Sequence, residues 1–114
     1  MKTSELTGAA LDWAVAKCEG AELYISYGAA CRVGGWIDYS TDWAQGGPII
    51  EREEIGVQCI PAGTRKGWWA LVTSRFHDRS SPDEVRGDTP LIAAMRCYVA
   101  SKLGDDVDVP PELV

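Results

Sequence analysis

The chain has 114 residues, of which 46% are hydrophobic and 25% charged, and its formal net charge at pH 7 is −6. This length fits one domain and excludes a second, and the composition is that of a globular protein and not of a disordered one. Affinity for duplex DNA comes largely from Lys and Arg residues that neutralise phosphates, so an acidic chain is not expected to bind duplex nucleic acid.

The cysteine pattern and the apolar runs bear on compartment. No secretory leader follows Met1, and no apolar run approaches the roughly 20 residues of a membrane span. We therefore expect a cytoplasmic protein with no membrane partner and with free thiols. Because the chain has no CxxC pair and His77 is its only histidine, we expect no metal site. The cysteines are Cys18, Cys31, Cys59 and Cys97.

Two long helices are predicted from their apolar faces and end signals. The first begins at Ser4 or Thr7, either of which can cap it, and runs to Glu19, where Gly20 supplies a left-handed stop. The last begins at the Asp88–Pro90 cap and is closed by Gly104. The residues expected in the core are Leu11 and Val15 of the first helix, and Leu91, Ile92, Met95, Val99 and Leu103 of the last.

The middle of the chain predicts a broken helix. The Tyr39–Trp43 segment has the pattern of a capped helical start, and Pro48 should interrupt that helix. A new short helix is expected from Pro48 to Glu54, with Gly56 as its end.

Three strands and two loops complete the prediction. The glycine-rich stretch from Gly28 to Gly35 and the polar stretch from His77 to Gly87 are expected to be loops. The predicted strands are Glu22–Tyr27, Val57–Ile60 and Trp68–Val72, the last two forming an antiparallel pair.

These elements predict an α+β fold, with a small antiparallel sheet sandwiched by helices in a single domain over residues 1–106. Residues 107–114 contain two prolines and are expected to form an extended acidic tail, with Val107, Val109 and Leu113 as the side chains that can pin it. Removing this tail is expected to leave the helices and the sheet folded.

Four blocks of the sequence resemble the NinX family of phage proteins. They occur in the family's order and cover nearly the whole chain, although the segment from Cys31 to Asp38 has no match. The layout also resembles, more distantly, the phage ABA-sandwich domains. The resemblance implies a phage or prophage gene of the early accessory region and an α+β sandwich, and it carries over no catalytic motif. The blocks are Leu11–Ala16, Tyr39–Trp43, Gly46–Glu53 and Thr89–Ala100, the last followed by Lys102–Asp105.

The first candidate ligand site is the block from Tyr39 to Arg52. Backbone amides of the Gly46–Gly47 pair and of the helix that follows could hold an anion, and the rings of Tyr39 and Trp43 could stack on a base. The alternative is structural, because the polar side chains can cap helix amides and the glycines can allow close packing. The candidate residues are Tyr39, Ser40, Thr41, Asp42, Trp43, Gly46 and Gly47.

Trp68 and Trp69 are neighbours on a predicted strand, so their rings point to opposite faces. One ring belongs to the core, and the other is packed under a helix or exposed at a pocket or interface. The sequence does not say which of the two is exposed, and Trp68 is kept as a candidate binding residue.

A basic stretch stands out in this acidic chain. Arg75, His77 and Arg79 could contact a phosphate, and the alternative is a solvated loop. A lone histidine without an orienting partner or a nucleophile is no catalytic set, so we predict no catalytic residue and no cofactor.

These features favour a non-catalytic phage protein that acts on the host by sequestering a small anionic, nucleotide-like molecule as counter-defence. The rival hypothesis is a protein-interaction factor that binds a host or phage protein through an exposed tryptophan face. A small hydrolase is a remote third, and the sequence leaves a homo-oligomer open.

Overall fold

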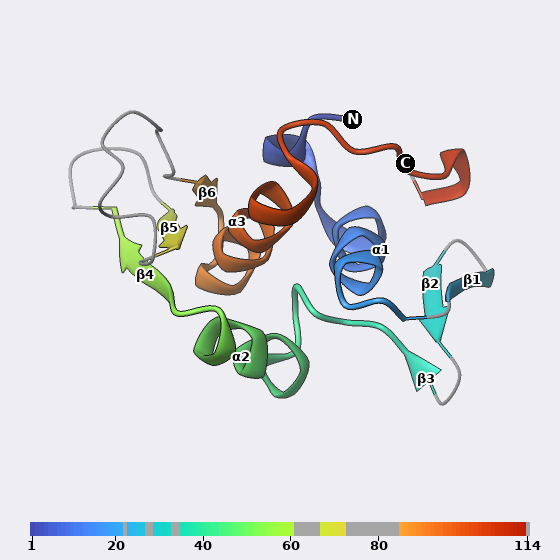
Figure 1. Ribbon diagram of the computed structural model, residues 1–114, viewed down its shortest axis with the longest axis horizontal. Helices are drawn as coiled ribbons and strands as arrows, with labels where there is room; N and C mark the ends of the chain where they lie inside the picture. Colours follow the sequence, from blue (N-terminus) through green and yellow to red (C-terminus); the bar gives the residue numbers. More distant parts are fainter. Residues whose placement is uncertain (22, 27–28, 33–34, 61–66, 73–84, 114) are drawn as a thin grey trace.

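The computed structural model describes residues 1–21, 23–26, 29–32, 35–60, 67–72 and 85–113 of the chain. Within these residues, helices and short strands alternate along the sequence (Figure 1). In chain order, the elements are η1 (Thr3–Glu5), α1 (Gly8–Cys18), β1 (Leu23–Ser26), β2 (Ala29–Arg32), β3 (Gly35–Trp36), α2 (Trp43–Arg52), β4 (Ile55–Cys59), β5 (Trp68–Val72), β6 (Val85–Gly87), α3 (Pro90–Leu103) and η3 (Pro111–Leu113).

The strands of the described residues form two antiparallel three-stranded sheets, ordered β1-β2-β3 and β4-β5-β6. Helix α3 packs against all three strands of the second sheet, and α1 packs against α3 and against β1 and β2. Figure 1 shows this order of layers, with α3 and α1 lying between the two sheets. The α+β class predicted from the sequence is confirmed, and α1 and α3 supply most of the core.

The core faces of α1 and α3 were predicted in large part. Leu11, Val15, Met95 and Val99 have no exposed surface. The prediction was wrong for Leu103, which is 37% exposed. Ile92 was also expected in the core and is only partly buried.

The two misplaced residues have a common geometric cause. At 3.6 residues per turn, Ile92 and Leu103 lie on the same side of α3 as Arg96. Arg96 is partly exposed, so α1 and the β4–β6 sheet do not fully cover this side of α3. The other sides of the helix are largely buried.

Helix α2 is continuous, so the predicted break at Pro48 was wrong. The structure has one helix from Trp43 to Arg52 with Pro48 inside it. The proline ring removes one backbone donor, which leaves the carbonyl of Ala44 without its i+4 partner. Because Ala44 and Pro48 are both exposed, water can hydrate that carbonyl and lower the cost.

The end of α2 also differs from the prediction. Glu54 adopts a left-handed conformation with φ of 54° just after the helix, and Gly56 lies inside strand β4. The left-handed residue that follows the helix is therefore Glu54, two residues before the glycine that was expected to end the helix.

The strand predictions succeeded where hydrophobic runs were long. Strands β4 and β5 form the predicted antiparallel pair, and their register aligns Val57 with Ala70. The stretch from Gly28 to Gly35 was wrongly predicted to be only loop, because β2 lies within it and β3 begins at Gly35. The polar stretch that ends at Gly87 includes strand β6, which was also predicted as loop.

The C-terminal segment is anchored to the rest of the molecule. Val107 and Leu113 are 5% and 8% exposed and belong to the core cluster. The backbone N–H of Val107 donates to the carbonyl of Met1, and that of Thr3 donates to the carbonyl of Asp105. The domain boundary at residue 106 stays a prediction, but apolar side chains beyond it are packed in the core.

Candidate functional site

The segment from Tyr39 to Asp42 has mainly a structural role and does not form an open binding surface. Tyr39 is 6% exposed in the core, so its ring is not available to stack on a base, contrary to the prediction. The carboxylate of Asp42 caps α2 by accepting a hydrogen bond from the Ala44 N–H at 2.9 Å. Ser40 is buried, whereas Thr41 is exposed.

The Gly46–Gly47 pair combines a packing site with an ordinary helical position. A Cβ on Gly46 would lie 2.5 Å from the carbonyl oxygen of Tyr39 and 2.6 Å from Cδ1 of Leu91. A Cβ on Gly47 would have its nearest neighbour at 4.0 Å, on the Trp43 ring. Gly46 therefore allows α2 to approach the segment before it and α3, which is the structural alternative raised for this pair.

The remaining predicted site residues are scattered. The ring of Trp43 is 55% exposed at the start of α2, whereas Trp68 is half-buried and packs against the core cluster. Arg75, His77 and Arg79 lie outside the described residues. The structure thus does not bring the described candidates together into one pocket.

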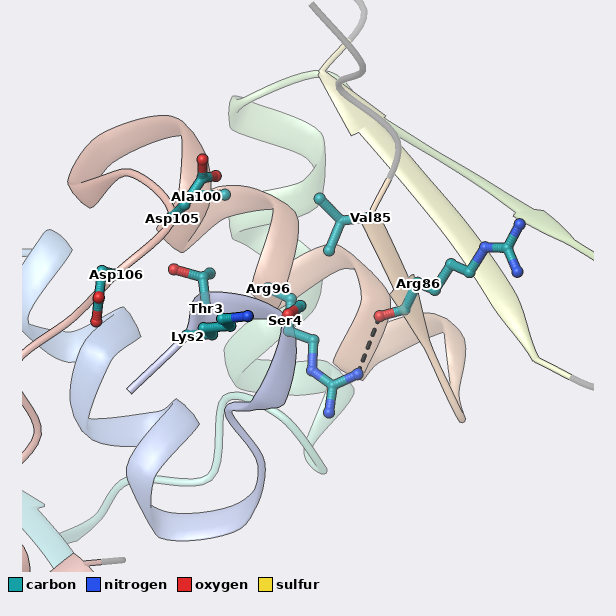
Figure 2. A pocket seen from close by; sticks show the side chains of 9 residues that line it. All are labelled: Lys2, Thr3, Ser4, Val85, Arg86, Arg96, Ala100, Asp105 and Asp106. Carbon is teal, nitrogen blue, oxygen red and sulfur yellow. Dashed lines mark hydrogen bonds between the residues drawn. The ribbon is translucent and has the colours of Figure 1, made fainter.

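A larger hollow, which we call the Arg96 hollow, lies between α3, β6 and the start of the chain. Its volume is about 630 Å³. Figure 2 shows Arg96 reaching from α3 and the Arg86 side chain pointing away from it. The lining residues are Lys2, Thr3, Ser4, Val85, Arg86, Arg96, Ala100, Asp105 and Asp106.

The guanidinium of Arg96 is held by backbone carbonyls. Its Nε donates to the carbonyl of Leu6 at 2.7 Å, and Nη1 donates to the carbonyl of Arg86 at 3.0 Å, the contact drawn in Figure 2. Burial lowers the pKa of Arg96, and the charge of Asp88 opposes that shift. Within the described part of the chain, Arg96 forms no ion pair with a carboxylate. A partly desolvated cation that forms no close ion pair with a described carboxylate is the electrostatic element of an anion site.

Sequence reasoning missed this hollow because its residues come from three distant segments. Lys2, Arg86 and Arg96 belong to no common motif. The only available signal was that Arg96 interrupts the apolar stripe of α3 between Ile92 and Val99.

A second, smaller hollow, which we call the Asp12 hollow, lies at the start of α1. Its volume is about 290 Å³. One wall carries Trp36, whose ring is 56% exposed. Of the predicted site residues that the structure describes, Thr41 lines this hollow. The lining residues are Gly8, Ala9, Asp12, Trp36, Ile37, Asp38 and Thr41.

The carboxyl of Asp12 is the buried polar group of this hollow. Asp12 is 6% exposed, and its Oδ1 accepts a hydrogen bond from the Ser40 N–H at 2.8 Å. The pKa of Asp12 is raised to about 6, mainly by burial; hydrogen bonding from Ser40 opposes the shift, and the nearby charge of Asp38 adds to it. The Ser40 side chain influences that pKa, but its buried hydroxyl does not meet hydrogen-bond geometry with any described residue.

A third polar cluster is satisfied internally. Arg52 contacts Glu19 at 2.7 Å, and the hydroxyl of Tyr98 donates to the same carboxylate at 2.6 Å. Hydrogen bonding from Arg52 lowers the pKa of Glu19. This network ties the ends of α1 and α2 to α3 and leaves little for a ligand to compensate.

The described residues contain no group of three or more Cys, His, Asp or Glu side chains arranged to bind a metal ion. No described helix is both long enough and apolar enough to cross a bilayer. The four cysteines are not joined by disulfides.

Comparison with known proteins places the chain in a phage family. No curated protein matches it. The family model described as "Bacteriophage P22, NinX" matches residues 2–102. This match covers η1, α1 and α2 and all of α3 but its last residue, and it includes both Asp12 and Arg96. The chain therefore belongs to the NinX family of phage proteins.

Proposed function

We propose that this NinX-family protein is a non-catalytic accessory protein that binds a small anionic, nucleotide-like molecule in the Arg96 hollow. In this role it would sequester a host signal or metabolite as counter-defence for the phage. The observation that carries the proposal is Arg96, a partly buried guanidinium bonded to two backbone carbonyls and to no carboxylate among the described residues.

The dimensions and the charge of the hollow support this function. A volume of about 630 Å³ lies within the range of roughly 300–1,000 Å³ typical of small-molecule sites. Lys2 adds a second cation to the lining. Asp105 and Asp106 oppose an anion, but Figure 2 shows Asp106 at the far side of the hollow from the Arg96 guanidinium. An anion beside Arg96 would thus gain a charge-assisted hydrogen bond at some distance from that acid.

The alternative, a protein-interaction factor, is supported by a different observation. Trp36 and Trp43 expose 56% and 55% of their surface, and exposed tryptophan is common at the centres of protein interfaces. Because an ordinary surface also carries single exposed apolar residues, we place this function second.

The test is calorimetry of the protein with inorganic phosphate, pyrophosphate, and linear and cyclic nucleotides. Arg96→Gln removes a charge-assisted hydrogen bond and should weaken binding roughly ten- to a hundred-fold. Arg86→Gln is the matched control, because its side chain points away from Arg96 and the substitution keeps the backbone carbonyl that accepts from Arg96 Nη1. Lys2→Gln changes an exposed residue and tests the site without disturbing the core.

The expected result is binding of at least one anion that is weakened by Arg96→Gln and Lys2→Gln and little changed by Arg86→Gln. The bound molecule should be recovered intact. If no anion in the panel gives heat, the protein-interaction alternative takes precedence, and recovery of a cleaved product would overturn the non-catalytic assignment.

A further inference from the structure

The Asp12 hollow has the opposite electrostatic character to the Arg96 hollow. Its charged lining residues, Asp12 and Asp38, are both acidic. Neither carboxylate forms an ion pair with a cation among the described residues. An acidic hollow in a chain with net charge −6 favours a positively charged occupant.

The Asp12 carboxyl is poorly compensated where it lies. It is 6% exposed, and its one hydrogen bond within the described residues comes from the Ser40 N–H. The neighbouring Ser40 hydroxyl, on a residue 2% exposed, has no hydrogen-bond partner in the described structure. The Ser40 N–H and the Ser40 side chain are both neutral, and both lower the pKa of Asp12. A buried carboxylate with only neutral polar neighbours of this kind gains from a ligand that brings N–H groups and positive charge.

The ring of Trp36 supplies a flat surface at the same hollow. A cation over the face of an indole is attracted by the negative face of the ring, and a planar guanidinium can also stack on it. The chain already contains one such contact, with the Lys17 ammonium 4.9 Å from the centre of the Trp13 ring.

One feature of the hollow opposes a cation. Gly8 and Ala9, which line it, form the first turn of α1, where the helix dipole places roughly half a positive charge. This partial charge is smaller than the two carboxylate charges of Asp12 and Asp38. The balance therefore remains in favour of a cation.

From these observations we propose that the Asp12 hollow captures an arginine side chain from a basic segment of a partner protein. The guanidinium would pair with the Asp12 and Asp38 carboxylates and stack on Trp36. A guanidinium is planar and presents several donors to one carboxylate, whereas an ammonium is a compact point charge. This proposal is independent of anion binding at the Arg96 hollow.

The chemistry is tested by titrating the protein with N-acetyl-arginine amide and with N-acetyl-citrulline amide, which keeps the planar shape without the charge. Only the arginine compound should bind. Trp36→Ala should weaken that binding about five- to ten-fold. Trp43→Ala, which removes an equally exposed tryptophan that does not line the hollow, should leave it unchanged.

The charge is tested with Asp12→Asn and Asp38→Asn, and with Asp108→Asn as an exposed control. Each hollow variant should weaken binding of the arginine compound about ten-fold or more, and the control should not. Asp38 is exposed, so its variant keeps the test valid if Asp12→Asn fails to fold.

The source of the guanidinium is tested with a short peptide that contains one arginine between lysines. Tighter binding of this peptide than of the free amide supports a protein partner, and equal binding overturns that assignment in favour of a small guanidine compound. Equal binding of citrulline and arginine, no binding of arginine, or equal losses in Trp36→Ala and Trp43→Ala would overturn the proposal as a whole.

Discussion

The buried carboxyl of Asp12 should make stability depend on pH. Its pKa is about 6 in the folded protein, above the value near 4 of an unfolded aspartate. The folded state therefore binds this proton more tightly than the unfolded state does. The resulting stabilisation is fully present below the unfolded pKa and is lost as the pH rises through 6.

Asp12→Asn should remove this part of the pH dependence while keeping an oxygen that can accept from the Ser40 N–H. Urea unfolding at about pH 5 and pH 7.5 measures it. The wild type should gain roughly 1 to 1.5 kcal/mol more than the variant on acidification. Asp108→Asn, at an exposed position, serves as the control and should behave as the wild type. Equal gains in all three proteins would show that the Asp12 carboxyl does not titrate as described.

The two neighbouring glycines of α2 should respond to alanine in opposite ways. Gly46→Ala places a Cβ against the Tyr39 carbonyl and the Leu91 side chain, and overpacking of this kind typically costs about 1–3 kcal/mol. Gly47→Ala meets only ordinary contact and should stabilise the helix by up to about 1 kcal/mol. Thermal unfolding of both variants tests the difference, and similar melting temperatures would contradict the packing role of Gly46.

At the scale of elements, helix α3 was predicted because its signals are local. Thr89, Pro90 and Gly104 mark its ends by their own conformational preferences, and all three occupy the expected positions. Strands β2 and β3 were missed because both are short, and β3 begins with glycine, so they depend on pairing partners more than on their own sequence. Pro48 misled the prediction of α2 because solvent exposure of the helix was not visible from the sequence.

The caps of α1 and α3 give a matched test at this scale. The hydroxyl of Thr89 accepts a hydrogen bond from the Ile92 N–H at 3.1 Å, whereas Thr7 occupies the same position in α1 without a side-chain capping bond. Thr89→Ala should therefore destabilise the protein by about 1 kcal/mol, and Thr7→Ala should have little effect. Chemical unfolding of the two variants measures this, and equal losses would mean that Thr7 caps α1 in solution.

At the scale of the whole molecule, the layers were more predictable than the hollows. Apolar periodicity predicted that α1 and α3 would carry the core, because the apolar residues of each buried helix face recur in consecutive turns of the sequence. The Arg96 hollow is lined by Lys2 and by residues near positions 86, 96 and 105, and no local sequence pattern predicts that these segments lie close together. The predicted site residues were chosen as sequence neighbours, and several of them instead cap or pack α2.

The C-terminal segment gives the last prediction, because its burial conflicts with the expectation that it is dispensable. Val107 and Leu113 are nearly fully buried, and complete burial of such a side chain is worth about 1.5–3 kcal/mol relative to exposure. Deleting residues 107–114 also removes the bond from the Val107 N–H to the Met1 carbonyl. The deletion should therefore lower the free energy of unfolding by roughly 2–5 kcal/mol.

The double substitution Asp108→Asn and Glu112→Gln, which changes exposed acids of the same segment, should cost far less. Urea unfolding of the three proteins distinguishes the cases. If the shortened chain unfolds with the wild-type midpoint, the segment is dispensable and the domain ends at residue 106; if only the deletion is destabilised, the apolar anchors at Val107 and Leu113 belong to the folding unit.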